Sequence, residues 1–235
     1  MSRMLKAAVA AAVFVSIGTM TGVVGGGVAA AAPTVALGGG SGIVLPDTDH
    51  ANPHVSGLCT LTAVGYDDAG SLVGLTAGHC GVPGDRVIAE YDEGAGVIGQ
   101  FRYTSPVTDI AVIDLDDAMV TPLRTVGGTT INGIGAAPAP GTIVCKEGRR
   151  TGTTCGVTWG YDQVYGEILE HACSMPGDSG GPVVVGDRLV GAVSNGFRPG
   201  CFDPGPPPFY APINAADINI GIADINAHGG GFRLF

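Results

Sequence analysis

Ser179 stands behind an aspartate and before two glycines in the stretch MPGDSGGPVVV, residues 175–185. A serine hydroxyl is a poor nucleophile at neutral pH unless a neighbouring base takes its proton. Glycine can adopt backbone angles that turn N–H groups toward a reacting atom. The same letters also suit an ordinary turn before a strand, so the possible partners of Ser179 decide between the two interpretations.

One interpretation is the G-x-S-x-G signature of α/β-hydrolases, which Gly177, Ser179 and Gly181 satisfy. That arrangement needs a helix directly after the serine and its acid and histidine further along the chain. Here the strand-like GGPVVVG follows, and His228 is the only downstream histidine. The chain also has almost no βα alternation. An α/β-hydrolase-type esterase is therefore the minor alternative.

The other interpretation needs a histidine and an aspartate upstream, in that order. LTAGHC places His79 on a turn at the end of the strand-like SLVGL, and Cys80 can fasten that turn to Cys59. Thirty residues on, TDIAVIDL places Asp109 just before an apolar run, where a carboxylate can be buried at a strand end. A β-rich domain can present both side chains at one cleft.

The elements that must position these side chains are short strands. The chain has 41 glycines in 235 residues and only 14% charged residues, which is a composition poor in helix formers. Clusters of Val, Ile, Thr and Tyr alternate with glycine-containing turns, which is typical of a barrel or sandwich. We predict an all-β fold of two antiparallel Greek-key β-barrels packed face to face, with a short C-terminal helix.

The strands fall into two sets around a stretch rich in proline and glycine. Near the end of the chain, Ile218, Ile222 and Ile225 share one face at helical spacing. We expect six parts along the chain: 1–31 signal peptide, 32–55 extended lead over the surface, 56–120 first barrel, 121–141 connection, 142–213 second barrel, 214–235 helix and tail.

The N-terminus has the pattern of a secretory signal. Arg3 and Lys6 precede an apolar stretch, and small residues at Ala29 and Ala31 favour cleavage after Ala31. An uncleaved membrane anchor is the alternative, and we expect no stable membrane insertion after cleavage. Cleavage leaves nine basic and 21 acidic residues, a net charge of −12. Such a surface repels nucleic acid, so we expect no nucleic-acid partner.

The six cysteines are even in number, which in an exported chain indicates disulfides. None forms a C-x-x-C pair, so we expect no metal site. Fifteen pairings are possible. The sequential one closes three local loops: Cys59–Cys80, Cys145–Cys155 and Cys173–Cys201.

TAGHC, DIAV and GDSGGP, in this order, resemble the motifs of chymotrypsin-like serine proteases. VCKEGRRTGTTCG and CSMPGDSGGPVV further resemble secreted bacterial members such as the streptogrisins and alpha-lytic protease. The resemblance covers roughly residues 56–220. It implies that Ser179 is the nucleophile, His79 the general base and then acid, and Asp109 the group that holds the imidazole. It also implies an oxyanion hole made of the backbone N–H groups of Gly177 and Ser179.

The same resemblance implies a buried partner for Asp178, because an unpaired buried charge is costly. In the bacterial proteases this partner is a basic residue after the first cysteine of the VC loop, which here is Lys146. Arg149 and Arg150 are the fallback partners. We therefore expect a Lys146–Asp178 ion pair and no ion pair made by chain cleavage.

The substrate pocket is expected around five residues. Ser194, Asn195 and Gly196 resemble the strand that pairs with the substrate backbone. His171 stands two places before Cys173, where trypsin-like members carry an aspartate, which argues against a preference for Arg or Lys. Met175 is placed at the pocket entrance.

The sequence therefore predicts a secreted, monomeric serine endopeptidase that acts on peptides or proteins without a metal or cofactor. The alternative from a different class is a catalytically silent member that binds a peptide or a partner protein through the same cleft.

Overall fold

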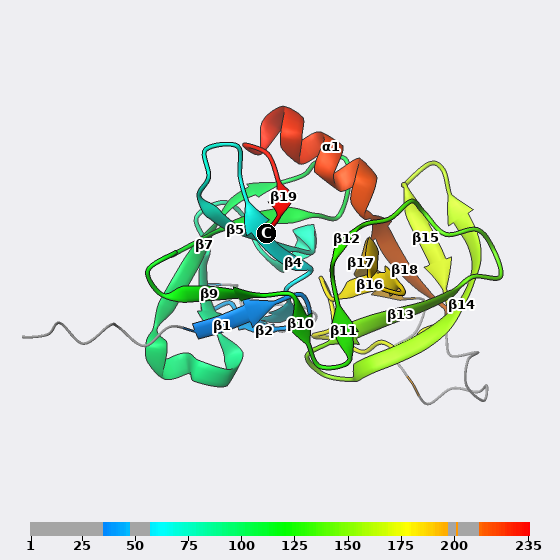
Figure 1. The fold of residues 1–235 in the computed structure, drawn as a ribbon, viewed down its shortest axis with the longest axis horizontal. Helices are drawn as coiled ribbons and strands as arrows, with labels where there is room; N and C mark the ends of the chain where they lie inside the picture. Colours follow the sequence, from blue (N-terminus) through cyan, green and yellow to red (C-terminus); the bar gives the residue numbers. More distant parts are fainter. Residues whose placement is uncertain (1–34, 48–56, 197–200, 202–211) are drawn as a thin grey trace, which may run out of the picture. The chain divides into compact units, whose positions relative to one another are not determined.

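The computed structural model describes residues 35–47, 57–196, 201 and 212–235. The predicted signal peptide lies outside the described residues, as do residues 32–34 and 48–55 of the predicted lead. No helix among the described residues is long and apolar enough to span a bilayer. The expected all-β fold with one short helix near the C-terminus is confirmed (Figure 1).

The first large sheet is antiparallel throughout and has eight strands. Its centre is β5, in which all five residues are buried, because both faces of this strand pack against other elements. In sheet order the strands are β19 (Arg233–Leu234), β4 (Ala63–Tyr66), β5 (Leu72–Thr76), β8 (Ala111–Leu115), β7 (Val97–Thr104), β6 (Arg86–Ala89), β2 (Gly42–Val44) and β3 (Leu58–Thr60).

The second large sheet closes into a barrel of six strands, because β17 pairs with both β16 and β18. A seventh strand, β12, adds to β17 in parallel. In sheet order the strands are β12 (Gly133–Ile134), β17 (Arg188–Gly196), β16 (Pro182–Val185), β13 (Ile143–Gly148), β14 (Gly152–Asp162), β15 (Glu167–Glu170) and β18 (Ile213–Asp217). A closed barrel is therefore seen for the later half, and the earlier half is an eight-stranded sheet.

Smaller elements complete the fold. They are the parallel pair β1 (Val35–Gly38) and β9 (Val120–Leu123), the hairpin β10 (Thr125–Val126) and β11 (Thr129–Thr130), and the 3-10 turns η1 (Gly78–Cys80) and η2 (Glu90–Ala95).

The prediction that the lead runs over the surface is wrong for residues 35–45. Leu37 and Ile43 are fully buried, and β1 and β2 pair with β9, β3 and β6. These strands have only four and three residues, so they show no periodicity among the surrounding glycines. Tertiary packing, rather than local pattern, makes them strands.

The helix α1 (Ile218–His228) follows β18 and carries the predicted apolar face (Figure 1). Ile218 and Ile225 are buried in one cluster with residues of the first sheet such as Leu75 and Val112. The helix begins at Ile218, because the preceding residues pair with β15 and β17 and the Asp217 side chain caps the first turn. Its buried face helps to pack strands of both large sheets into one cluster.

Three disulfides are present, and they follow the sequential pairing: Cys59–Cys80, Cys145–Cys155 and Cys173–Cys201. Cys145 and Cys155 stand directly opposite each other on β13 and β14. Cys59–Cys80 joins β3 to the turn that carries His79.

Candidate active site

His79 and Asp109 are held together by two contacts from one carboxylate. The turn η1 starts just after the buried strand β5 and is tied to β3 by Cys80. Asp109 Oδ2 lies 2.7 Å from His79 Nδ1, and Asp109 Oδ1 accepts the His79 backbone N–H at 2.8 Å. Because the carboxylate can only accept, Nδ1 carries a proton and Nε2 is left as the basic nitrogen.

Ser194 supplies a third contact to Asp109. Its hydroxyl donates to Asp109 Oδ2 at 2.6 Å, and Ser194 is itself buried. Burial raises the pKa of Asp109, but the hydrogen bond and charge of His79 and the Ser194 hydroxyl outweigh it and lower that pKa below its usual value. The carboxylate therefore stays ionised and can stabilise a protonated imidazole.

The loop that carries Ser179 is held from the first sheet through its carbonyl groups. Thr60 Oγ1 donates to Gly177 O at 2.9 Å, Thr60 N to Ser179 O at 2.8 Å, and Thr62 Oγ1 to Gly180 O at 2.6 Å. Within the described residues, the N–H groups of Gly177 and Ser179 have no hydrogen-bond partner. Gly177 has φ +103°, a conformation that favours glycine. The loop thus offers two free donors beside the serine.

Ser179 comes close to the His79 turn through its neighbour Gly180. A methyl group on Gly180 would lie 2.3 Å from Thr60 O and 2.8 Å from the backbone N of Ala77, two residues before His79. In the described part of the chain, no hydrogen bond joins the Ser179 hydroxyl to the His79 ring. The structure thus places His79 and Asp109 in direct contact, and it places Gly180 of the serine loop against Ala77, just before the His79 turn.

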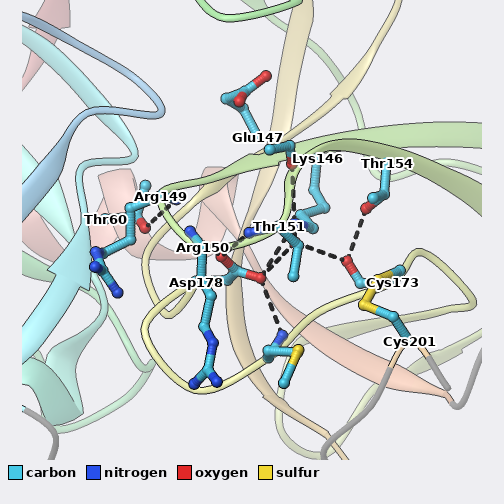
Figure 2. Close-up of polar contacts among 12 residues, drawn as sticks. Thr60, Lys146, Glu147, Arg149, Arg150, Thr151, Thr154, Cys173, Asp178 and Cys201 are labelled. Atoms are coloured by element: carbon cyan, nitrogen blue, oxygen red, sulfur yellow. Dashed lines mark hydrogen bonds and ion pairs between the residues drawn. A yellow bond between two sulfur atoms is a disulfide. The ribbon is translucent and has the colours of Figure 1, made fainter.

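Asp178 is fully buried beneath the loop, and Lys146 is its charged partner at 3.2 Å (Figure 2). Thr151 contributes a hydroxyl at 2.6 Å and a backbone N–H at 3.2 Å, and the N–H groups of Arg150 and Met175 complete the set. Burial raises the pKa of Asp178, and the Lys146 charge and these donors lower it to a net value below the usual one.

The two fallback arginines do not form an ion pair with Asp178. Arg149 pairs with Glu90 on η2, and Arg150 directs its Nη1 to Pro176 O at 3.2 Å. Lys146 is instead enclosed, and its Nζ also donates to Gly152 O at 3.0 Å and to Thr151 Oγ1. Burial lowers the pKa of Lys146, which the charge of Asp178 opposes.

The segment Ser194–Gly196 lies at an open strand edge. β17 pairs with β16 up to Ala192, Val193 bonds to Gly180 and Gly181, and Asn195 and Gly196 pair with β18 alone among the described strands. His171 donates its backbone N–H to Val157 O at 3.2 Å, and its ring lies 6.2 Å from that of Trp159. Met175 contacts Asp178 through its backbone and is half-buried. The open edge of β17 can add an extended peptide as a further strand.

Sequence reasoning missed two carboxylates on β15. Asn214 Nδ2 donates to Glu167 Oε2 at 2.6 Å, and burial, with the nearby negative charges of Asp162 and Asp109, raises the pKa of Glu167. Burial raises the pKa of Glu170 to about 7. In the letters EILE the two glutamates only flank a pair of apolar residues, so no signal in the sequence marked them.

The fold and this site define the class of chymotrypsin-like serine proteases. Residues 63–218 match the model of the trypsin family, and the chain belongs to that family. The expected membership is therefore confirmed.

Relatives of this chain include bacterial proteases. Streptogrisin-C of Streptomyces griseus is 30% identical over 168 residues, which cover 66% of this chain and 35% of that protein. Serine protease 1 of Rarobacter faecitabidus is 29% identical over 189 residues, which cover 73% and 34% of the two chains. The chain thus spans about a third of the length of these two relatives.

Solved structures share the fold. Thermobifida fusca protease A superimposes with a TM-score of 0.64 at 24% identity, covering 86% of this chain and all of that one. Cellulomonas bogoriensis chymotrypsin gives a TM-score of 0.63 at 23% identity over the same share of this chain.

Proposed function

We propose that this protein is a secreted serine endopeptidase that cleaves peptide bonds through an acyl-enzyme. The observation that carries the proposal is the His79–Asp109 pair, together with a serine loop in which the N–H groups of Gly177 and Ser179, like the second ring nitrogen of His79, have no hydrogen-bond partner among the described residues. Membership of the trypsin family supports it.

In the proposed mechanism, Ser179 Oγ attacks the carbonyl carbon of the substrate while His79 Nε2 takes the hydroxyl proton. The carbonyl oxygen becomes negative and accepts hydrogen bonds from the N–H groups of Gly177 and Ser179. His79 then gives its proton to the leaving nitrogen, and the C–N bond breaks. Water attacks the acyl-enzyme with His79 again as base, which restores Ser179. Asp109 keeps the imidazole in the required tautomer and stabilises its charged form.

The open edge of β17 supports the choice of extended peptides as substrates. A peptide that pairs with Ser194–Gly196 would place its carbonyl groups in register with the serine loop. Peptides and proteins are therefore the proposed substrates, taken by a monomer. No preference for a particular side chain follows from His171 and Met175.

The proposal is tested by incubating the purified protein with a fluorophosphonate and mapping the adduct by mass spectrometry. We expect one adduct, on Ser179, and none in a His79→Ala variant, because the hydroxyl then has no base. A folded protein that is not labelled would instead favour the catalytically silent peptide-binding alternative.

Secretion is the second part of the proposal. It depends on the signal pattern of residues 1–31, and three disulfides support it because such bonds persist in oxidising compartments. N-terminal sequencing of the protein recovered from culture medium should begin at Ala32. Recovery only from the membrane fraction, with residue 1 still present, would contradict it. The division of the chain into a first barrel (56–120), a connection (121–141) and a second barrel (142–213) is also a proposal.

A further inference from the structure

Two nitrogens of the Arg149 guanidinium bind Glu90, and the third has no hydrogen-bond partner among the described residues. Nε donates to Glu90 Oε2 at 2.6 Å, and Nη2 contacts Glu90 Oε1. The hydrogen bond and charge of Glu90 raise the pKa of Arg149, although burial opposes them. The side chain is only 16% exposed, so this two-point contact fixes its position. Nη1 has no hydrogen-bond partner among the described residues.

That free nitrogen lies beside the serine loop. A methyl group on Gly177 would be 2.7 Å from Arg149 Nη1. The Arg149 backbone N–H donates to Thr60 Oγ1 at 3.1 Å, and the same hydroxyl donates to Gly177 O. Both the main chain and the side chain of Arg149 are therefore held against the residue that offers one of the two free donors.

Arg150 adds a second cation beside the serine loop, because its Nη1 donates to Pro176 O at 3.2 Å and its side chain is exposed. The carboxylates near the two arginines are already engaged. Glu90 binds Arg149, Asp178 binds Lys146, and Glu147 accepts from Gly128 N at 3.1 Å. An anion arriving from solution could therefore accept hydrogen bonds from Arg149 Nη1 and from the exposed Arg150 guanidinium, while these carboxylates keep their own partners.

The order of contacts along the loop shows which part of a substrate meets the arginines. At its far end, Gly180 N and Gly181 O bond to Val193 of β17 at 2.7 and 2.8 Å. At its near end, Gly177 bonds to Thr60 and lies against Arg149. A peptide whose acyl part pairs with β17 must therefore run its leaving part over the arginine flank.

We infer that Arg149, with Arg150, binds an acidic side chain in the first two residues after the scissile bond. Arg149 Nη1 and the exposed guanidinium of Arg150 can each donate a charge-assisted hydrogen bond to a carboxylate oxygen. Glu90 acts as a positioning residue, since it fixes the direction of the free nitrogen. The inference depends on the proposed function, and it assigns a local preference for acidic leaving segments to a chain whose overall net charge is −10.

The test is competition for the acyl-enzyme. One peptide ester forms the same acyl-enzyme in every reaction, and dipeptide amides that differ only in Asp, Asn or Lys at the first or second position compete with water. The ratio of aminolysis to hydrolysis is internal to each enzyme, so changes in overall rate cancel. For the wild type we expect the Asp nucleophile to exceed the Asn one by about tenfold, with Lys lower still.

Arg149→Gln should reduce the Asp-to-Asn ratio to within about twofold, because a neutral side chain recognises both amides alike. Glu90→Gln should lower the ratio partly, through a weaker apparent affinity for the Asp nucleophile at an unchanged limiting rate. Arg86→Gln is the matched control. Arg86 makes a similar two-point contact with Asp47 away from the loop, so this variant should keep the wild-type ratio.

An active enzyme that takes all nucleophiles equally, or an Arg149→Gln variant with the wild-type ratio, overturns the inference and leaves the proposed function intact. A protein that forms no acyl-enzyme overturns the proposed function instead. In that case, binding of Asp- and Lys-containing peptides to Ser179→Ala, with and without Arg149→Gln, still decides the role of the arginine.

Discussion

Asp109 and Asp178 are two carboxylates that each contact a basic side chain, one in each half of the molecule. Asp109 and its partner His79 have side chains that are 22% and 48% exposed. Asp178 and Lys146 are both fully enclosed. Asp109 accepts three hydrogen bonds, and Asp178 accepts from one ammonium group, one hydroxyl and three backbone N–H groups.

The difference lies in whether a proton can move. A half-exposed imidazole can exchange its proton with a substrate, so the Asp109 pair suits chemistry. An enclosed ammonium has no access to a substrate with which to exchange its proton, so the Asp178 pair can only hold the loop in shape. Partner type and burial, rather than the presence of an ion pair, thus separate a working carboxylate from a structural one.

The largest expected effect follows from Asp109→Asn. The amide can donate to Nδ1, which favours the wrong imidazole tautomer, so kcat should fall by about 10⁴-fold. The melting temperature should change little, because the shape is kept. Steady-state kinetics with an ester substrate and thermal unfolding measure the two. Asp114→Asn, on the adjacent strand, is the control, and retention of a tenth of the activity by Asp109→Asn would contradict the assignment.

Lys146→Met should give the next largest effect, now on stability. It leaves the Asp178 charge buried without its cation, which costs about 3–5 kcal/mol. Urea unfolding with the disulfides intact measures the loss. Lys146→Arg, which keeps the charge, should lose less. Equal stability of Lys146→Met and wild type would mean that the pair does not hold the loop.

A matched pair of hydroxyl deletions sharpens the comparison. Ser194→Ala and Thr151→Val each remove one hydroxyl bond of 2.6 Å, to Asp109 and to Asp178 respectively. Each bond to a charged group contributes on the order of 1.5 kcal/mol. Ser194→Ala should lower kcat about tenfold with little loss of stability, and Thr151→Val should do the reverse. The same outcome for both variants would remove the distinction drawn here.

The smallest effect is the acid dependence of stability. The pKa of Asp178 is lower in the folded protein than its usual value of 3.8. Its contribution is therefore complete above that value and is lost as pH falls through the folded pKa, at about 1.4 kcal/mol per pH unit for one proton. Urea midpoints between pH 2 and 6 should show this slope. The dependence of the urea midpoint on pH should be weaker in the double variant Lys146→Met, Asp178→Asn. An equal dependence in that variant would mean that groups other than Asp178 cause the acid sensitivity.

The sequence alone predicts the all-β fold, the family, and the two carboxylates, Asp109 and Asp178, with their basic partners. The glycine turns and the apolar runs around His79 and Asp109 are local signals, and the cysteine spacing favours the disulfides that form. Lys146 could be chosen because its position follows a cysteine motif. These features depend on neighbours within a few residues, or on motifs whose order along the chain is readable.

What could not be predicted depends on contacts between distant segments. Thr60 and Thr62 hold the serine loop, but in CTLTAVG they look like ordinary strand threonines. Ser194 resembles part of the substrate strand, and only the structure shows its bond to Asp109. Leu37 lies among glycines and is nevertheless buried, because β9 provides its pairing partner from 85 residues further along the chain.

The hydrogen bonds from Thr60 and Thr62 to the serine loop also bear on the order in which parts of the chain fold. Thr60 and Thr62 reach across 117 and 118 residues of chain to Gly177 and Gly180. Contacts between such remote positions form late, since loop closure must come before they contribute. A chain that is still folding would thus have its histidine turn assembled while the serine loop lacks these two hydrogen bonds, so the two parts of the candidate site would come together only late in folding.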